Sequence, residues 1–286
     1  MNLDLEDIHV DSLTDILKAS FSLENWEGML LVADRLYKAI SDLYETKQLE
    51  RANNNTFTSL NLKNSIVYYF GFSLCSKGIA LQKQGRYSES RACIQQYSDL
   101  SWINGLDDEG WVEVEYYRNI AIANRYVIDL TEGKTYVLQD YVAFIRNNRE
   151  ELLPGLITIL ESAITFDYSI DSVVAEFGEI IDSMCEFYKT KAKIRYYVDY
   201  KYLLARYYHK QDRNEIAIHT ILKSLQTSSN LKDDTGIIKS VALFEFLRNH
   251  ANNTQHQVYK NIMKNILEGG VNDEKGILID GIPSVS

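Results

Sequence analysis

The sequence predicts an all-α protein, a solenoid of stacked helical hairpins with essentially no strand. The chain of 286 residues has only 2 prolines, which suits long helices because helix interiors do not tolerate proline. Apolar residues recur with a period close to 3.6 through most of the sequence. Short polar turns centred on glycine or aspartate separate these runs in pairs, a pattern typical of antiparallel helices joined tightly.

The clearest hairpin is predicted between residues 65 and 100. Gly78 lies inside a helical run without a polar break, so we interpret it as a point of close contact between helices. Gly85 ends that run as a turn, and Tyr87 begins a second helix with a small residue at Ser90. This order of small, turn, aromatic and small residues resembles a tetratricopeptide (TPR) unit, a repeat of about 34 residues.

A second TPR-like hairpin is predicted between residues 191 and 230. Ala205 is the small residue of its first helix, and Asp212 lies at its turn. The turns at Gly85, Gly133 and Asp212 lie 48 and 79 positions apart, so the units are irregular. We therefore expect a right-handed superhelical solenoid of TPR-like hairpins with roughly 12 to 14 helices.

The other helices are predicted from their apolar stripes and from the residues at their ends. Carboxylates around Asp107 suit the first turn of a long helix, where the helix dipole favours negative charge. Asp11 can cap the first helix, the polar segment 51–56 indicates a loop, and Pro154 can begin a helix because proline is tolerated there. These expected helices cover about residues 11–17, 26–44, 107–132, 136–146, 154 onward, 170–188, 235–250 and 255–267.

Three segments are expected along the chain. Residues 1–20 hold a short helix with a flexible start, residues 21–268 form the TPR-like solenoid, and residues 269–286 form a flexible tail.

Composition narrows the possible functions. A net charge of −10 argues against direct binding to nucleic acid or to an anionic membrane, which both need a basic surface. No apolar run approaches about 18 residues and no signal peptide is visible. The 3 cysteines show no CxxC pairing and indicate reduced, buried thiols. We expect a cytoplasmic protein.

The sequence shows no recognisable catalytic motif. The 5 histidines have no ligand spacing such as HExxH, and there is no phosphate-binding glycine loop or nucleophile elbow. We therefore expect a non-enzyme without catalytic residues, metal or cofactor. An active site spread across the array is the alternative.

The resemblance to TPR proteins predicts a peptide-binding surface. TPR arrays bind ligands in the groove lined by the first helix of each pair, and asparagine there can both donate to and accept from a peptide bond. For any one residue, solvated surface or helix packing is the alternative. The predicted peptide-binding residues are Gln82, Tyr117, Asn119, Asn124, Asp199, Tyr202, Arg206 and His209.

Several segments also resemble the TPR portion of the peptide-pheromone-responsive regulators of Gram-positive bacteria, the Rap, NprR, PlcR, PrgX and AimR group. They are residues 24–37, 78–87, 106–110 and 152–156. The resemblance covers most of residues 20–268. It implies a bacterial quorum-sensing protein that binds a short signalling peptide in its groove. Peptide binding would then control transcription or a partner protein through a change in curvature or in dimer contacts.

One feature departs from this group. Most of its transcription factors begin with a helix-turn-helix DNA-binding domain, which the first 20 residues do not suggest. We expect either the regulatory portion of a longer protein or a member that works through protein contacts, with a regulated protein or a second copy as partner. The other function considered is a constitutive adaptor that holds a folded protein and has no peptide ligand.

Overall fold

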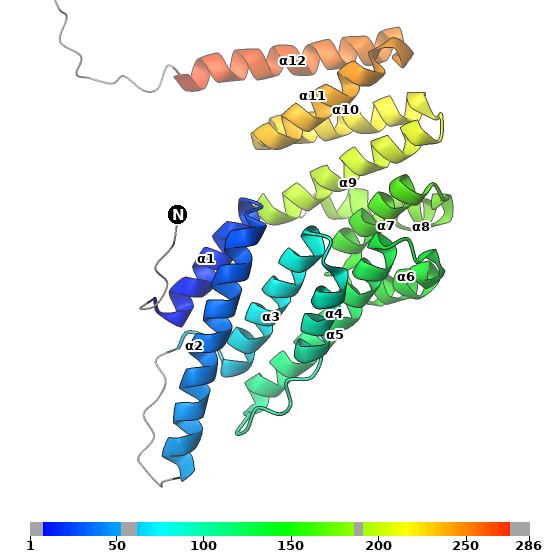
Figure 1. Cartoon of the computed structure of the whole chain (residues 1–286). Helices are drawn as coiled ribbons and strands as arrows, with labels where there is room; N and C mark the ends of the chain where they lie inside the picture. Colours follow the sequence, from blue (N-terminus) through cyan, green and yellow to red (C-terminus); the bar gives the residue numbers. More distant parts are fainter. Residues whose placement is uncertain (1–7, 53–61, 186–190, 275–286) are drawn as a thin grey trace, which may run out of the picture. The chain divides into compact units, whose positions relative to one another are not determined.

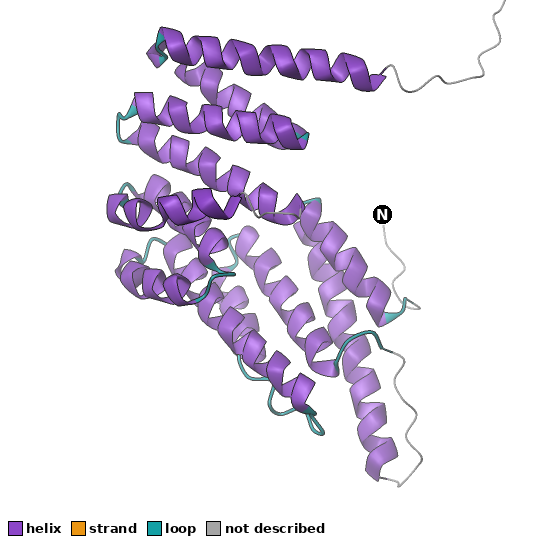
Figure 2. Ribbon diagram, turned by 180° about the vertical axis from the view of Figure 1, so that it is seen from behind, coloured by secondary structure: helices purple, strands orange, loops and turns teal. Residues whose placement is uncertain are grey.

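The computed structural model describes residues 8–52, 62–185 and 191–274, and these residues form helices joined by loops, without any strand (Figure 2). They form twelve α-helices and two short 3-10 turns. The predicted all-α class is therefore confirmed. Within the described residues no helix is both long enough and apolar enough to cross a membrane.

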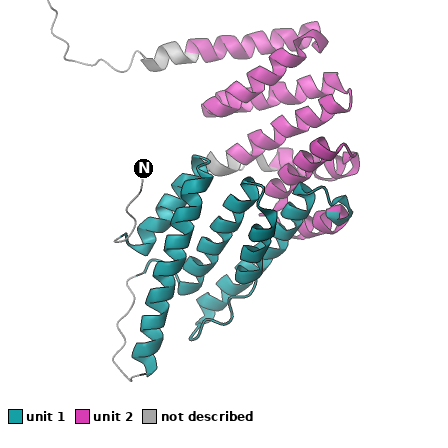
Figure 3. Cartoon of the chain, in the orientation of Figure 1, with its two compact units in different colours: residues 1–137 teal, residues 138–286 magenta. Residues whose placement is uncertain are grey.

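The chain divides into two compact units, residues 1–137 and 138–286 (Figure 3). Each unit has a hydrophobic core of its own. Of the segment 1–20 that the sequence analysis set apart, the structure describes residues 8–20. Leu13 and Leu17 of the first helix are fully buried in the core of unit 1.

Unit 1 is a succession of helices in which each one packs on the next, as Figure 1 shows. The third helix contacts both the fourth and the fifth. The elements are α1 (Val10–Ser22), α2 (Trp26–Ala52), α3 (Ile66–Lys83), α4 (Tyr87–Tyr97), α5 (Asp108–Thr131) and the 3-10 turn η1 (Thr135–Val137).

Helices α3 and α4 form the hairpin that the sequence predicted. The Ser90 hydroxyl donates to the Gly78 carbonyl at 2.7 Å. A Cβ atom added at Gly78 would lie 3.4 Å from the Cβ of Cys93, so the two helices approach closely at this point. The turn between them contains Gly85 with φ 75°, a left-handed conformation that glycine adopts without strain.

Helices α3 and α5 lie side by side and run in the same direction. The Ser65 hydroxyl donates to Glu113 at 2.8 Å, and further along the Asn124 amide nitrogen lies 3.8 Å from the Cys75 sulfur. Residue numbers therefore rise together along both helices. This parallel arrangement is expected for the first helices of two successive hairpins.

Unit 2 contains the second predicted hairpin, α9–α10, with further helices packed on it. Helix α9 contacts α7, α10 and α11, while α10 also contacts α11 and α12. The elements are α6 (Leu138–Asn147), α7 (Leu152–Phe166), α8 (Asp171–Cys185), α9 (Lys191–Lys210), α10 (Asn214–Leu231), α11 (Asp234–Leu247), the 3-10 turn η2 (Arg248–His250) and α12 (Asn253–Glu274).

Several predicted helix boundaries are wrong, by as much as eight residues at the end of the helix expected over 26–44. The cap of α1 is His9, whose ring nitrogen accepts from the backbone N–H of Asp11 at 3.3 Å. Asp11 instead lies buried and accepts a hydrogen bond from the Tyr69 hydroxyl. Helix α2 continues to Ala52, and α12 continues to Glu274. Residues 1–7 and 275–286 of the predicted flexible ends lie outside the described residues.

The two cysteines with described side chains are free thiols, as the sequence indicated. Cys93 is buried and Cys75 is half-buried. Burial raises the pKa of the Cys93 thiol, so this sulfur is poorly suited to act as a thiolate nucleophile. The side chain of Cys185 lies outside the described residues.

The turn of the second hairpin leads to the first testable prediction. Asp212 has φ 56°, whereas Gly85 holds the corresponding turn in unit 1. We expect Asp212→Gly to stabilise unit 2 by about 0.5–1 kcal/mol, because a β-carbon is disfavoured in the left-handed region. The reciprocal change, Gly85→Asp, should destabilise unit 1 by about 1 kcal/mol. Urea unfolding measures both, and a loss of stability in Asp212→Gly would contradict the argument.

Candidate functional site

Four of the predicted peptide-binding residues lie along one side of α9. Asp199, Tyr202, Arg206 and His209 are spaced by three or four residues, so they share one face of the helix. That face meets α11. The Lys239 ammonium lies 2.8 Å from Asp199, and the His209 ring lies edge-on to another aromatic ring of α11.

We define the α9–α11 surface as Asp199, Tyr202, Arg206 and His209 of α9 together with Lys239 and Phe246 of α11. The contact of Asp199 with Lys239 lies near one end, and that of His209 with Phe246 (5.5 Å between ring centroids) lies near the other. Residue numbers rise together, so α9 and α11 are parallel. The four predicted residues thus share one face of α9, and Lys239 and Phe246 of α11 lie against that face.

The α9–α11 surface carries an excess of positive charge on an acidic protein. Asp199 accepts from Lys239 and from Arg195, whose Nε lies 3.2 Å away. The Arg206 guanidinium lies 5.8 Å from the ring centre of Tyr202. Among the described residues, Arg206 has no carboxylate partner. A negatively charged ligand group can therefore bind there without displacing an existing ion pair.

The same surface offers aromatic groups to an apolar side chain. Phe246 is 71% exposed, so its ring is accessible to a ligand. The His209 ring packs against it, and its Nδ1 lies 2.7 Å from the Asn214 side-chain oxygen, which fixes the ring orientation. The surface thus combines a cation with an accessible aromatic platform.

The prediction for Tyr117 in unit 1 is wrong, because this side chain is part of the core. Tyr117 is only 2% exposed. Its hydroxyl donates to the backbone carbonyl of Tyr68 at 3.0 Å, and its ring fills the space left by Gly71. Burial raises the pKa of Tyr117 above its ordinary value. The ring therefore cannot reach a ligand at the surface.

The other three predicted residues of unit 1 do not form one site. Asn124 is half-buried, and its amide donates to the Tyr97 hydroxyl at 2.8 Å. Asn119 is exposed, and five residues of helix turn it about 140° away from Asn124. Gln82 is half-buried in the last turn of α3.

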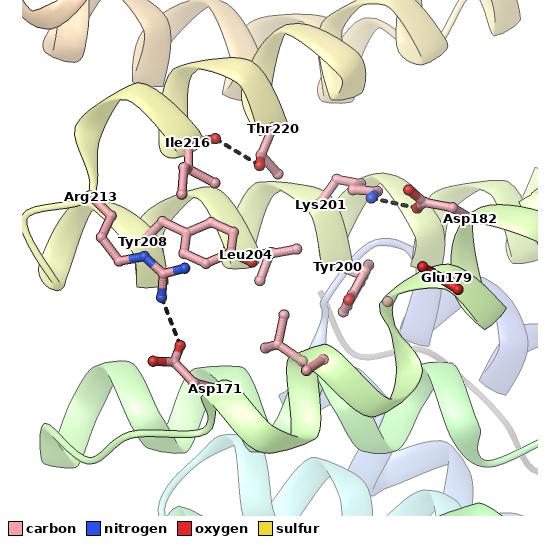
Figure 4. A pocket seen from close by; sticks show the side chains of 13 residues that line it. Asp171, Glu179, Asp182, Tyr200, Lys201, Leu204, Tyr208, Arg213, Ile216 and Thr220 are labelled. Carbon is pink, nitrogen blue, oxygen red and sulfur yellow. Dashed lines mark hydrogen bonds and ion pairs between the residues drawn. The ribbon is translucent and has the colours of Figure 1, made fainter.

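Unit 2 also contains an open cleft of about 740 Å³ that the sequence analysis missed. We call it the α8–α10 cleft, because α8, α9 and α10 line it (Figure 4). An ion pair lies at each end. Arg213 lies 2.8 Å from Asp171, and Lys201 lies 2.5 Å from Asp182.

Lys201 is the unusual residue of this cleft. It is 5% exposed, and its ammonium lies 5.5 Å and 5.7 Å from the ring centres of Tyr197 and Tyr200. Burial, and then the nearby Asp182 charge, raise the pKa of Tyr200. One signal could have revealed the cleft: Lys201 interrupts the apolar stripe of α9 that includes Leu204.

The α9–α11 surface and the α8–α10 cleft lie on nearly opposite sides of α9. At about 100° per residue, the group around Tyr202 and Arg206 points roughly 160° away from the group around Lys201 and Leu204. Within the described residues, no group of three or more His, Cys, Asp or Glu could hold a metal ion.

Comparison with known proteins gave no match for this chain. No family model fits the sequence, and no curated protein or solved structure matches it. The resemblance to the peptide-responsive regulators therefore stays a prediction.

Proposed function

We propose that this chain is a non-catalytic cytoplasmic regulator built from TPR-type hairpins, which binds a short linear peptide on the α9–α11 surface. Peptide binding would change its conformation or its contacts with a second copy, and so control transcription or a partner protein. Support comes from the parallel α3–α5 and α9–α11 pairs and from the residues gathered on the second pair.

The observation that carries the proposal is that Arg206 has no ion-pair partner among the described residues. This guanidinium is exposed, lies over the Tyr202 ring and has no carboxylate partner among the described residues. Arginine forms strong charge-assisted hydrogen bonds with carboxylates. The C-terminal carboxylate or an acidic side chain of a peptide fits this position, with an apolar side chain against Phe246.

The mechanism we propose is a population shift. A peptide that contacts Arg206 on α9 and Phe246 on α11 binds best at one spacing of the two helices. It therefore stabilises the conformations that have this spacing. The size of the effect equals the difference in its binding free energy between conformations with and without this spacing. A partner or dimer surface that depends on the same spacing is then gained or lost.

The test is a binding screen with fluorescein-labelled linear hexapeptides that have free carboxyl termini. We expect saturable binding with micromolar or tighter affinity for a subset of sequences. Arg206→Ala should weaken it at least roughly tenfold, since hydrogen bonds between charged groups contribute about 1.5–3 kcal/mol. Lys223→Ala, which removes an exposed cation of α10, is the matched control and should change the affinity less than about twofold.

Two results would contradict the proposal. One is the absence of saturable binding across the peptide set. The other is equal peptide affinity of the wild type and Arg206→Ala, which would show that the peptide does not bind on the α9–α11 surface.

The adaptor function draws support from Ile238 and Phe246, two exposed apolar side chains of α11 at 68% and 71% exposure. A folded protein could cover both. Affinity purification from a native lysate separates the functions. A partner retained at saturating hexapeptide concentration would favour the adaptor, and release by the peptide would favour the regulator.

A further inference from the structure

The α8–α10 cleft is an open space in the packing of unit 2. Ion pairs connect α8 to its neighbours at each end, through Asp171 and through Asp182. Between them the middle of α8 faces open volume, and a Cβ atom added at Gly178 would meet no atom within 4 Å. The volume of about 740 Å³ lies within the range of small-molecule sites, about 300–1,000 Å³.

The charges of the cleft do not balance. Among the side chains that the structure describes, three carboxylates and two cations line it. Each cation already has a carboxylate partner, Asp171 for Arg213 and Asp182 for Lys201. Glu179 is the remaining carboxylate, and it is exposed with no partner among the described residues. The cleft therefore complements a ligand of positive charge.

A buried polar group also lacks a partner here. Tyr200 is 1% exposed, and its hydroxyl has no hydrogen-bond partner among the described residues. Figure 4 shows this side chain at the end of the cleft where Glu179 and Asp182 lie. Buried hydroxyl groups are normally hydrogen-bonded, so the unpaired hydroxyl of Tyr200 indicates incomplete packing at this end of the cleft.

The remaining walls suit an aliphatic chain and tolerate cations. Val174, Leu204 and Ile216 line the cleft. The Arg213 guanidinium lies 4.6 Å from the ring centre of Tyr208, so cations already rest on an aromatic wall.

We propose that the α8–α10 cleft binds an organic cation, an ammonium or guanidinium group on an aliphatic stem. The Glu179 carboxylate holds the cation, and the stem packs against Val174, Leu204 and Ile216. Such a cation can come from a free amine or from a lysine or arginine side chain of a peptide. The site lies on the opposite side of α9 from the α9–α11 surface and does not depend on the function proposed for that surface.

Calorimetric titration of the full chain with hexylamine and agmatine tests this proposal, with hexanoate as the anionic counterpart of hexylamine. We expect saturable binding of the two cations and none of hexanoate. Glu179→Gln should weaken binding roughly tenfold, as expected for the loss of one charge-assisted hydrogen bond. Glu161→Gln, which neutralises an exposed carboxylate of α7, is the matched control and should leave the affinity unchanged.

A second variant fills the cleft without entering the core. Gly178→Leu places a side chain in the open volume, so helicity should be retained while hexylamine binding is lost. Arg206→Ala should bind hexylamine as the wild type does, which separates this test from the peptide proposal. Comparison of agmatine with the blocked peptide acetyl-Ala-Lys-Ala-amide identifies the source of the cation. Tighter binding of agmatine indicates a free amine, and tighter binding of the peptide indicates a side chain.

The proposal is overturned if neither cation binds, if hexanoate binds as tightly as hexylamine, or if folded Gly178→Leu retains the wild-type affinity.

Discussion

Gly71→Ala should destabilise unit 1 by about 2–4 kcal/mol, the cost of severe overpacking in a core. A Cβ atom at position 71 would lie 2.2 Å from the ring of Tyr117, a contact that no rotamer of the new methyl group can relieve. In an unobstructed helix, a change from glycine to alanine stabilises the protein by about 1 kcal/mol. A loss of stability in Gly71→Ala would therefore indicate close packing at this position. Urea unfolding followed by circular dichroism measures the effect.

Gly178→Ala is the matched control for this prediction. Gly178 also lies inside a helix, but a Cβ atom there has no neighbour within 4 Å. We expect a gain of about 0.5–1 kcal/mol. In the double variant Gly71→Ala/Tyr117→Leu the two changes should couple by at least about 1 kcal/mol, because the smaller residue makes room for the methyl group. Additive effects of the two changes would contradict the packing described for Tyr117.

The helices and turns were predictable because their signals are local. The turns at Gly85 and Gly133 have φ 75° and 81°, and Asp212 has φ 56°. Glycine and aspartate are among the residues that tolerate this region, so the sequence marks each turn directly. The close contact at Gly78 could also be predicted from the sequence. Glycine destabilises a helix interior, so an uninterrupted apolar helix retains it chiefly where a neighbouring helix needs the space.

The placement of side chains on α5 was not predictable from spacing alone. Tyr117 is buried because Gly71, 46 residues earlier in the chain, leaves room for its ring. Periodicity predicts which side of a helix is apolar, but it does not say whether that side faces a groove or a core. Asn119 and Asn124 were grouped by proximity in sequence, yet they point to different sides of the helix.

The resemblance to TPR proteins assigns the four residues to the first helix of a hairpin, and the structure places them on one face of α9. Their role in peptide binding stays a prediction. The α8–α10 cleft was not predicted. It depends on how α8 lies across α9 and α10, a tertiary arrangement in which ion pairs join residues far apart in sequence, such as Asp171 and Arg213. Only Lys201, a charge within an apolar stripe, gave a local indication.

Asp182→Leu should destabilise unit 2 by about 2–3 kcal/mol. Lys201 has a side chain that is 6% exposed, and its ammonium lies 2.5 Å from the Asp182 carboxylate. Removal of the carboxylate leaves a buried cation without its ion-pair partner, which costs about 3–5 kcal/mol at a fully buried site. Asp182 is 41% exposed, so water can solvate part of the charge and the expected cost is smaller. Urea unfolding at low salt measures it.

The double variant Lys201→Met/Asp182→Leu separates the cost of an unpaired charge from the contribution of the pair itself. Replacement of a buried ion pair by apolar residues of similar size is often neutral or stabilising. We therefore expect the double variant to recover most of the stability lost in Asp182→Leu. If the double variant is as unstable as the single one, the loss arises from the packing of α8. If Asp182→Leu has no effect at all, Lys201 reaches water and the cleft is more open at this end than the structure indicates.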